Sequence, residues 1–579
     1  MSPPVLTADM DIGLAGSGPA VDAAAAALGD VDVETEEAPP GRLGAFDFAV
    51  VVGTVGADAF HTAEEGCDRW AAVEVGGVGG RPLDGLDAAV SLFGPRTGCH
   101  RCLRRRVAAA DEDRGETEPT GVRSAVRYAG ALVGRRVVRH LAGDDLAGTV
   151  AEVPGGERRL LPVPGCRCGD GRDRTLALDH RGVDLPDALD RMERAVDDRL
   201  GVVTEVAERE SFPAPYYLAA TADTTGFSDA SAAGFAAGTA ADWNVAYAKA
   251  VGEALERYAA GVYRRDELVT ATAAALDGAV APERFVAPEG DGRPGPDEEI
   301  DWVPALELDA VDAEEPAWLP AAVVHHPPPA ERVRPPITTG LGLGSSTVEA
   351  TLSGLYEVVE RDAAMLSWYS TADPLGLAVD DETFATLERR ASAEGLSVTA
   401  LLLTQDVDVP AVACAVHRKG EWPRFAAGSD ADLDVAAAAT AALAEALQNW
   451  MELRGMGRDR AADQGGDIGR YAALPEEARE FVDPETTVPA ASVGDDDAPG
   501  GEAELRALVE RVTDAGLTPY AGRLTTRDLV TLGFEAVRVV VPTAQPLFQG
   551  EPYFGDRLGR VARSMGFEPA PDRPYHPFP

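Results

Sequence analysis

Along the first part of the chain, apolar runs typical of β-strands alternate with a stretch that has helical spacing. Within residues 1–60, a short apolar run leads into three glycines (Gly13, Gly16 and Gly18), an alanine-rich stretch with helical spacing and the apolar run 46–53. This order predicts strand, turn, helix and buried strand, as in half of a Rossmann-like fold. The glycine-rich turn has two possible interpretations, a nucleotide-binding loop and a plain tight turn. The tight turn is favoured because the spacing is not a clean G-x-G-x-x-G.

The rest of the chain mixes the two periods, which predicts an α/β (mixed α+β) fold. Helical spacing predicts helices at 124–143, 186–210, 340–365 (after its first glycines), from about Asn244, and at 431–456. Strands are predicted within 396–416. The Pro- and acid-rich stretch 287–302 predicts a loop or linker, and 486–501 a flexible loop.

One polar pattern occurs twice on predicted helices. The order Glu-x-x-Glu-Arg is found at Glu253, Glu256, Arg257 and again at Glu357, Glu360, Arg361. Positions i, i+3 and i+4 share a helix face, so each copy gathers its charges on one side. An exposed acidic stripe with a local Glu–Arg pair is the simpler interpretation of either copy alone. Two copies in similar surroundings favour a pseudo-symmetric core.

Composition limits the function classes. With 579 residues, about two to four domains are expected. Lys+Arg number 52 against 97 Asp+Glu, a net charge of −45, and the two lysines are Lys249 and Lys419. Such acid excess suits solubility in high salt, as in a halophilic protein, and disfavours nucleic acid as a partner. The N-terminus has no signal-peptide pattern and no apolar run approaches about 18 residues, so we expect a cytoplasmic protein with no membrane partner.

Four cysteines form two close pairs. Cys99 and Cys102 have C-x-x-C spacing, and Cys166 and Cys168 have C-x-C spacing. Zinc takes four tetrahedral thiolates, and a site closed by four protein ligands is structural. Unpaired structural cysteines or a redox pair are the alternatives. The sequence favours a structural zinc tetrathiolate.

Acidic residues on the predicted helices are the other candidate chemistry. They are Glu253, Glu256, Glu349, Glu357, Glu360 and Glu445, with Arg257 and Arg361 beside them. The chain shows no G-x-S-x-G, Walker A or H-E-x-x-H motif. Clustered carboxylates with arginine suit magnesium held between the protein and a polyphosphate. The predicted chemistry is therefore an ATP site outside the P-loop class.

The chain ends in the proline-rich sequence DRPYHPFP. A disordered tail is the simpler interpretation of such an end. Pro577 and Pro579 stiffen the backbone, however, and Tyr575 and Phe578 could anchor it. A stiff terminus would deliver the carboxylate of Pro579 to a defined place.

These motifs together resemble those of a known family. Residues 211–579 resemble the YcaO superfamily through VGEALERY, GSSTVEATLSGLYEVVERDA, AALAEALQ and the closing HPFP. Residues 1–200 look like the ThiF-like partner domain often fused to such proteins, through TGCHRCLRRR and VPGCRCG. The resemblance implies a ThiF-like, zinc-containing domain that recruits a leader peptide, followed by a pseudo-symmetric catalytic domain.

The resemblance also implies an activity. It is an ATP- and magnesium-dependent cyclodehydratase that forms thiazoline or oxazoline rings in a ribosomally made precursor peptide. Backbone thioamidation and a non-catalytic scaffold that binds a leader peptide are the alternatives. Besides the peptide, the expected partners are a second copy of the chain or a modification enzyme such as a flavin dehydrogenase.

Site residues follow from the resemblance position by position. The first acidic motif, which binds magnesium, matches Glu253 and Glu256. The motif for magnesium and ATP phosphates matches Glu349, Glu357, Glu360 and Arg361. A third motif matches Glu445, a nucleotide-contacting position matches Ser345, and the tail carboxylate, expected in proton transfer, matches Pro579.

The chain departs from the family pattern at three places. Ala441 stands where an arginine is expected, and Tyr575 replaces the first proline of the tail. Upstream polar contacts to ATP have no obvious counterpart, and Ser228 and Ser231 are the candidates. These departures concern the efficiency of ring formation rather than the ATP site.

Overall fold

The computed structural model describes residues 10–578, apart from 32, 111–117, 291, 312–314, 330–332, 465–466 and 496–497. The chain forms two compact units. The first comprises Met1–Arg172, Arg194–Glu205 and Ala222–Ser228, and the second comprises Asp173–Glu193, Val206–Thr221 and Asp229–Pro579. The two predicted domains, 1–200 and 211–579, stay a prediction. Among the described helices, none is both long and apolar enough to cross a membrane.

The first unit is built on a seven-stranded sheet in the order β2-β1-β3-β4-β7-β8-β9. Its strands are β1 (Asp11–Ala15), β2 (Glu34–Glu37), β3 (Phe48–Thr54), β4 (Trp70–Val75), β7 (Ala88–Phe93), β8 (Thr149–Val153) and β9 (Glu157–Arg159). The four strands from β2 to β4 are parallel, and the remaining pairings are antiparallel. Its helices are α1 (Pro19–Gly29), α2 (Asp58–Gly66), α3 (His100–Ala109) and α4 (Arg123–Leu141), and a ribbon joins β5 (Gly77–Val78) to β6 (Arg81–Pro82).

The glycine-rich turn after β1 is explained by close packing within the unit. Gly16 has a φ of +125°, and an added Cβ would lie 2.3 Å from the Val52 carbonyl oxygen. A Cβ on Gly13 would lie 2.6 Å from the Phe46 ring. Both positions therefore need glycine for conformation or space. These contacts support the tight-turn interpretation.

The predicted helix at 186–210 is wrong over its second half. Leu185–Glu193 is helix α5, but Val203–Glu210 is strand β10. β10 is the edge strand of the sheet β10-β11-β12, where β11 is Tyr216–Thr221 and β12 is Phe235–Thr239. Pairing with β11 overrides the weak local helical pattern, and the charged side chains suit an edge strand.

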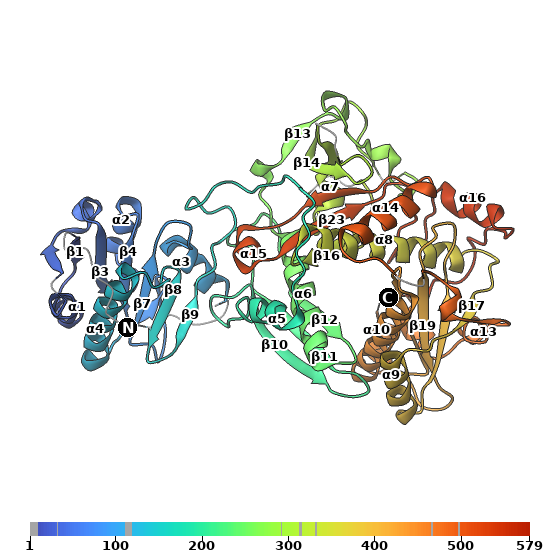
Figure 1. The fold of residues 1–579 in the computed structure, drawn as a ribbon, viewed down its shortest axis with the longest axis horizontal. Helices are drawn as coiled ribbons and strands as arrows, with labels where there is room; N and C mark the ends of the chain where they lie inside the picture. Colours follow the sequence, from blue (N-terminus) through green and yellow to red (C-terminus); the bar gives the residue numbers. More distant parts are fainter. Residues whose placement is uncertain are drawn as a thin grey trace. The chain divides into compact units, whose positions relative to one another are not determined.

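Two larger sheets form the body of the second unit (Figure 1). One has the order β13-β14-β22-β23-β16, with β15 also paired to β14, and the other β20-β19-β18-β17-β21. The first contains β13 (Val269–Ala271), β14 (Ile300–Glu307), β15 (Ala317–Pro320), β16 (Leu341–Gly344), β22 (Tyr520–Arg523) and β23 (Glu535–Val540). The second contains β17 (Leu375–Ala378), β18 (Ser397–Leu402), β19 (Ala411–His417), β20 (Phe425–Ala431) and β21 (Thr487–Pro489).

Three long helices pack on the two larger sheets and on the β10-β11-β12 sheet. α6 (Trp243–Gly261) packs on β12, α8 (Thr347–Trp368) on β16 and β23, and α10 (Val435–Met456) on β20 and β19. Asp242, Ser346 and Asp434 cap their N-termini by accepting backbone N–H bonds, which fixes where each helix begins. α8 is buried along most of its length, as its apolar sequence predicts. The helices predicted from Asn244, within 340–365 and over 431–456 are therefore confirmed.

The remaining elements are shorter. The other helices are α7 (Ala321–Val324), α9 (Glu382–Ala393), α11 (Arg458–Ala462), α12 (Ile468–Tyr471), α13 (Glu476–Phe481), α14 (Glu502–Asp514), α15 (Arg527–Leu532) and α16 (Asp556–Ser564). Single 3-10 turns lie at Pro40–Ala45, Arg265–Glu267, Ala273–Ala275, Pro282–Arg284 and Ala490–Ser492. The loop predicted at 486–501 is wrong at its start, because β21 pairs there with β17.

The three long helices repeat one packing arrangement with the strand before them. Gly238 in β12, Gly342 in β16 and Gly428 in β20 each face the backbone of the following helix. An added Cβ would lie 2.0 to 2.5 Å from the nearest helix backbone atom. Only glycine lets strand and helix approach so closely. The second unit thus contains three similar strand–helix units, β12–α6, β16–α8 and β20–α10.

Candidate active site

One glutamate on each long helix accepts a hydrogen bond from the backbone of the preceding strand or the residue before it. The bonds run from the N–H of Ala237 to Glu253 (3.1 Å), of Gly340 to Glu357 (2.8 Å) and of Ser429 to Glu445 (2.7 Å). A backbone N–H fixes the orientation of a carboxylate and favours its charged form. One carboxylate on each long helix is therefore fixed by the strand region that precedes the helix. We call them the strand-bonded glutamates.

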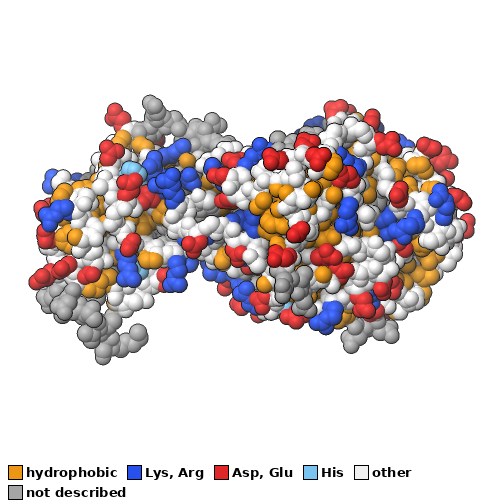
Figure 2. Space-filling model, turned by 90° about the horizontal axis from the view of Figure 1, so that it is seen from above, with side chains coloured by type: hydrophobic (Ala, Val, Ile, Leu, Met, Phe, Trp, Pro, Cys, Tyr) orange, Lys and Arg blue, Asp and Glu red, His pale blue; other side chains and the backbone are white. Residues whose placement is uncertain are grey.

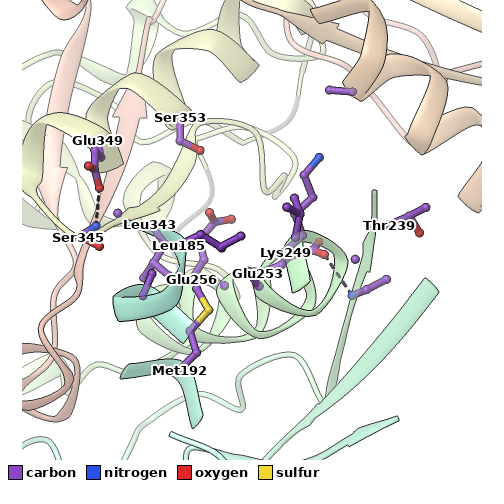
Figure 3. A pocket seen from close by; sticks show the side chains of 18 of the residues that line it. Leu185, Met192, Thr239, Lys249, Glu253, Glu256, Leu343, Ser345, Glu349 and Ser353 are labelled. Atoms are coloured by element: carbon purple, nitrogen blue, oxygen red, sulfur yellow. Dashed lines mark hydrogen bonds between the residues drawn. The ribbon is translucent and has the colours of Figure 1, made fainter. Parts of the chain in front are cut away.

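A cavity of about 690 Å³ lies among these helices (Figure 3). Its acidic lining residues are Glu253, Glu256, Glu349, Asp430 and Glu445. Lys249 is the one basic side chain among the described residues that line it. Apolar side chains of Leu185, Met192 and Phe534 form other parts of the wall. The cavity therefore combines crowded carboxylates, one amine and apolar surface.

Five of the predicted ATP- and magnesium-binding residues line this cavity, namely Glu253, Glu256, Ser345, Glu349 and Glu445. Three others, Glu357, Glu360 and Arg361, are not among its lining residues. They are connected to it through the Arg361 guanidinium, which lies 3.3 Å from Glu360, 3.9 Å from Glu445 and 4.0 Å from Glu357. The structure thus separates the predicted set into cavity residues and a supporting network.

Glu360 is the most enclosed member of the supporting network. Its side chain is 7% exposed and accepts a 2.6 Å hydrogen bond from the Ser429 hydroxyl. Burial raises the pKa of Glu360 well above its ordinary value, although Arg361 acts in the opposite direction. This carboxyl connects α8 to β20, the strand that precedes α10.

The cavity carboxylates repel one another. Burial, followed by the charges of Glu357 and Glu253, raises the pKa of Glu256 to about 8. Burial also raises the pKa of Glu253 and of Glu445, partly offset by Arg257 and Arg361 respectively. Carboxyl groups that are costly to ionise together become stable when a cation lies between them. The donor set, all carboxylate oxygen, fits magnesium.

The turn between β16 and α8 shapes one edge of the cavity. The Ser345 N–H donates to Glu349 over 2.8 Å, and Ser346 caps the helix. Thr347 donates its hydroxyl hydrogen to the carbonyl of Ala177 over 2.8 Å and accepts from the N–H of Asp179 over 2.7 Å. The chain around residues 177–179 therefore fixes the turn that presents Ser345.

A second cavity, of about 660 Å³, lies on the other side of Glu253. The two cavities share Ala237, Glu253 and Gln448 in their linings. Arg257 lines the second one, forms an ion pair with Glu253 and donates to the Phe235 carbonyl over 3.4 Å. Glu253 therefore stands between two spaces, one acidic and one containing arginine.

Sequence reasoning did not identify several residues that line the first cavity. Lys249, Asp430 and Ser353 are the main ones, and the only sequence signal for Lys249 was the scarcity of lysine. Burial raises the pKa of Asp430 to about 7, while Lys249 lowers it. Ala441 also lines the cavity, so the expected arginine at this position would have altered the charge of its wall. Neither Ser228 nor Ser231, the upstream candidates, is among the described lining residues.

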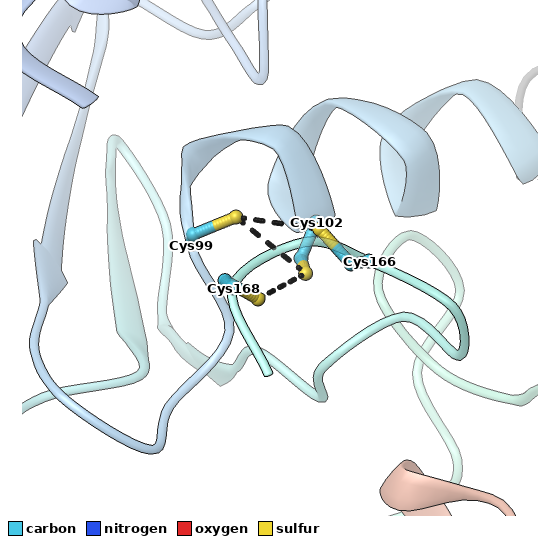
Figure 4. Close-up of side chains that lie close together, drawn as sticks. All are labelled: Cys99, Cys102, Cys166 and Cys168. Atoms are coloured by element: carbon cyan, nitrogen blue, oxygen red, sulfur yellow. Dashed lines mark hydrogen bonds between the residues drawn. The ribbon is translucent and has the colours of Figure 1, made fainter. Parts of the chain in front are cut away.

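The four predicted zinc ligands lie together in the first unit (Figure 4). Cys99 precedes α3 and Cys102 lies in its first turn, while Cys166 and Cys168 lie in one loop. Their sulfur atoms all lie within 4.8 Å of one another. Three separations are 3.5, 3.7 and 3.8 Å. Tetrahedral zinc with Zn–S bonds of about 2.3 Å places its sulfurs about 3.8 Å apart, so the cluster fits zinc.

Ionisation of the four thiols supports the same interpretation. Contacts with Cys102 first, then Cys166, raise the pKa of Cys99, and contacts led by Cys166 raise that of Cys102. The contact with Cys102 lowers the pKa of Cys166 to about 6. Four thiolates this close are stable together only around a cation. The cluster is therefore compatible with a metal-bound tetrathiolate.

The C-terminal tail is anchored rather than loose. Trp368 donates its indole N–H to the Pro574 carbonyl over 2.8 Å, and Phe578 packs edge-on against its ring. His576 is buried, which lowers its pKa to about 4. Tyr575 donates its hydroxyl to the Phe548 carbonyl. Pro579, the predicted catalytic residue, lies outside the described residues.

Comparison with known proteins places this arrangement in a family. The family model described as YcaO cyclodehydratase, ATP- and Mg²⁺-binding, matches residues 237–545, more than half of the chain. An uncharacterised protein from Methanothermobacter thermautotrophicus is 29% identical over 346 residues, which is 57% of this chain and 85% of that protein.

Solved structures resemble the chain over almost its whole length. A heterocyclase in complex with substrate and cofactor has a TM-score of 0.73 at 21% identity, over 96% of this chain and 83% of that one. The heterocyclase TruD has a TM-score of 0.65 at 20% identity, over 96% of this chain and 82% of that one. At these identities the likeness shows a shared fold. With the family model covering all three strand–helix units, the chain belongs to the YcaO cyclodehydratase family and is an ATP-dependent enzyme of that family.

Proposed function

We propose that the enzyme closes thiazoline or oxazoline rings in a ribosomally made precursor peptide, with ATP and magnesium. The observation that carries the proposal is the cavity where three equivalent helices present carboxylates, inside the region matched by the family model. Two heterocyclases share the overall fold. The carboxylates of this cavity suit a metal–polyphosphate complex.

Four residues are proposed to hold the magnesium ions: Glu253, Glu256, Glu349 and Glu445. They come from all three long helices and line one cavity. Held by these residues, magnesium would offset the charge of the ATP phosphates, including the charge that develops on the transferred phosphoryl group. The strand N–H bonds to Glu253 and Glu445 would keep these carboxylates in place as the metal enters and leaves.

The supporting network would then position the reacting groups. Arg361 links Glu360 to Glu445, and Ser429 donates to Glu360, so α8 and α10 keep a fixed separation. In the proposed reaction, a Cys, Ser or Thr side chain of the peptide attacks the preceding backbone carbonyl carbon. The resulting oxyanion takes the γ-phosphoryl group of ATP, which releases ADP. Loss of inorganic phosphate and the amide proton then leaves the azoline ring.

The most direct test of this function is mass spectrometry combined with an ATPase assay. With a Cys-, Ser- and Thr-rich precursor, magnesium and ATP, the wild type should hydrolyse ATP in a peptide-dependent way. Each ring should remove about 18 Da, the mass of one water. The Glu445→Gln variant should be inactive, whereas Glu382→Gln, a change in the first turn of α9 outside the cavity lining, should behave as wild type. A wild type without peptide-dependent hydrolysis would contradict the proposal.

Two alternatives give different results in the same assay. Backbone thioamidation would need a sulfur donor and would add about 16 Da per site instead of removing water. A non-catalytic scaffold that binds a leader peptide would show no peptide-dependent ATP hydrolysis. It would also tolerate the Glu445→Gln change.

For the first unit, we propose a ThiF-like domain that recruits the leader peptide and holds a structural zinc ion. Support comes from the Cys99, Cys102, Cys166 and Cys168 cluster, whose sulfur separations fit zinc. Metal analysis of the purified protein should find about one zinc per chain. Cys102→Ser should abolish it, and Cys67→Ser, outside the cluster, should not. Four freely titrating thiols in the wild type would contradict the zinc site.

A further inference from the structure

Each long helix presents to the cavity wall a residue one turn before its strand-bonded glutamate. These residues are Lys249 on α6, Ser353 on α8 and Ala441 on α10, each four residues before its glutamate. All three line the cavity. A separation of four residues places each side chain on the same helix face as its glutamate. The three positions therefore contribute an amine, a hydroxyl and a methyl group to the wall.

Lys249 supplies the positive charge on this part of the cavity wall. The cavity has five lining carboxylates, and no other lysine or arginine lines it among the residues the structure describes. Arg257 and Arg361 lie nearby but are held by carboxylates, Arg257 by Glu253 and Arg361 by Glu360. An anion entering this cavity would meet the Lys249 amine before any other unengaged cation of its lining.

The Lys249 amine is available for a ligand. Its side chain is exposed and makes no ion pair or hydrogen bond within the described part of the chain. It extends from α6 into the cavity (Figure 3), whose lining also includes Asp430 and Glu445. An amine held near carboxylates but bonded to none of them is poised for a shared anionic or metal-bound ligand.

The choice of lysine is also informative. Lys+Arg number 52 in the chain, and the two lysines are Lys249 and Lys419. Arginine carries nearly all the other positive charge. Figure 2 draws the lysine and arginine side chains together in blue, and on the face shown they are interspersed with acidic ones. A compact ammonium has three donors that rotate freely, which suits a point contact with phosphate where space is limited.

We infer that Lys249 contacts the phosphate chain of the nucleoside triphosphate bound in this cavity. The assignment deepens the proposed function and rests on it. Lys249 would offset part of the repulsion between the phosphates and the five carboxylates, a contribution that the uncharged side chains of Ser353 and Ala441 cannot make. It would therefore distinguish a triphosphate from an uncharged nucleoside.

Equilibrium binding of a non-hydrolysable ATP analogue with Mg²⁺ tests this assignment, with adenosine as the uncharged comparison. Isothermal titration of Lys249→Gln should show about 10- to 100-fold weaker binding of the analogue, as expected for a lost charge-assisted hydrogen bond. Adenosine binding should be unchanged within about 2-fold. Lys249→Arg should retain most of the affinity for the analogue, because it keeps the charge.

The chain offers two matched controls. Lys419→Gln removes the other lysine, which does not line the cavity, and should leave both affinities unchanged. The double variant Lys249→Gln, Ala441→Lys moves the ammonium to α10, at another position that lines the cavity. It should regain about 10-fold in affinity for the analogue. Thermal unfolding of each variant, expected to match the wild type because Lys249 is exposed, separates binding from folding.

Two results would overturn the assignment while the wild type still binds the analogue. One is unchanged affinity in Lys249→Gln, and the other is an equal loss for adenosine and the triphosphate. Failure of the proposed function looks different. A wild type that binds the analogue normally but modifies no precursor peptide contradicts ring formation and leaves the Lys249 result standing. If the wild type shows no Mg²⁺-dependent binding of the analogue, both the proposed function and the Lys249 assignment are contradicted.

Discussion

Helices α6 and α8 carry the same Glu-x-x-Glu-Arg pattern in different surroundings. On α6, Glu253 and Arg257 form a pair whose side chains are 32% and 33% exposed. On α8, the Arg361 side chain is 12% exposed and approaches carboxylates from two helices. The same five-residue pattern thus forms a local pair in one copy and a connection between helices in the other.

The second glutamate of each pattern shows the same contrast. Glu360 accepts from Ser429 and lies 3.3 Å from Arg361. Glu256 has neither a hydrogen bond nor an ion pair within the described residues, yet it lines the cavity. A carboxylate without a hydrogen-bond or ion-pair partner in the protein is available to a metal ion. A carboxylate that has such partners instead keeps the surrounding helices and strands in place. Between the two Glu-x-x-Glu-Arg patterns, the comparison therefore favours metal binding by the copy on α6 and positioning by the copy on α8.

The largest expected difference between the two copies lies in their arginines. Arg361→Ala would leave Glu360 and Glu445 without their counter-charge in a buried place, so we expect a loss of about 3–5 kcal/mol in unfolding free energy. Arg257→Ala removes one partner of a half-exposed pair, and we expect a loss of about 0–1 kcal/mol. Urea denaturation of both variants measures the difference. Equal losses would show that the two copies have equivalent roles.

A second experiment tests whether the strand–helix packing of β12–α6 and that of β16–α8 contribute equally to stability. A Cβ on Gly238 would lie 2.2 Å from Ala250 N, and one on Gly342 would lie 2.0 Å from Ala350 O. We expect Gly238→Ala and Gly342→Ala each to cost about 1–3 kcal/mol in stability, because backbone must move.

Gly252 on α6 is the matched control for these glycines, since the nearest atom to an added Cβ is 3.8 Å away. Gly252→Ala should be neutral or stabilise the protein by about 1 kcal/mol, the helix-propensity gain of alanine. Denaturation midpoints measure all three variants. A destabilised Gly238→Ala beside an unaffected Gly342→Ala would mean that α6 and α8 do not share one packing arrangement.

Much of this comparison could be predicted from the sequence, because it depends on local periodicity. The apolar spacing located all three long helices, and the repeated order of Glu and Arg indicated that two of them were related. The four cysteines could be predicted to lie together because a zinc site needs this residue type in closely spaced pairs. Each cysteine pair and each copy of the Glu–Arg pattern lies within a few residues along the chain.

Features that depend on tertiary pairing could not be predicted. Strand β10 was missed because its backbone bonds are made to β11, not within its own segment. Asp430 and Lys249 meet in one cavity only after β20 and α6 have packed, and no local pattern marks either. The role of Arg361 likewise depends on Glu445, on a helix far along the chain.

The smallest expected effect is on the pH dependence of stability in the metal-free protein. The pKa of Glu256 is raised to about 8 in the fold from an ordinary value of 4.5, so the folded state binds the proton more tightly than the unfolded state. The contribution of Glu256 to stability is then fully present at low pH and is lost as the pH rises between these two values. The Glu256→Gln variant should lose less stability as the pH rises. In the wild type, added Mg²⁺ should likewise reduce the loss of stability with rising pH.

Thermal unfolding between pH 5 and 8, without metal, measures this pH dependence; the range follows from the Glu256 pKa. The effect should be smaller than those above because water in the cavity screens the charge. A profile unchanged by Glu256→Gln would show that Glu256 is not the unpartnered carboxylate of the comparison.

The central claim is that carboxylates from all three helices hold one metal–nucleotide complex. Electron paramagnetic resonance of Mn²⁺, in place of Mg²⁺, with a non-hydrolysable ATP analogue tests it in Glu253→Gln, Glu349→Gln and Glu445→Gln, one variant per helix. Each should weaken nucleotide-dependent Mn²⁺ binding by about 10- to 100-fold. Glu382→Gln on α9 should not change it. Mn²⁺ binding with nucleotide that none of the three variants weakens would contradict the account.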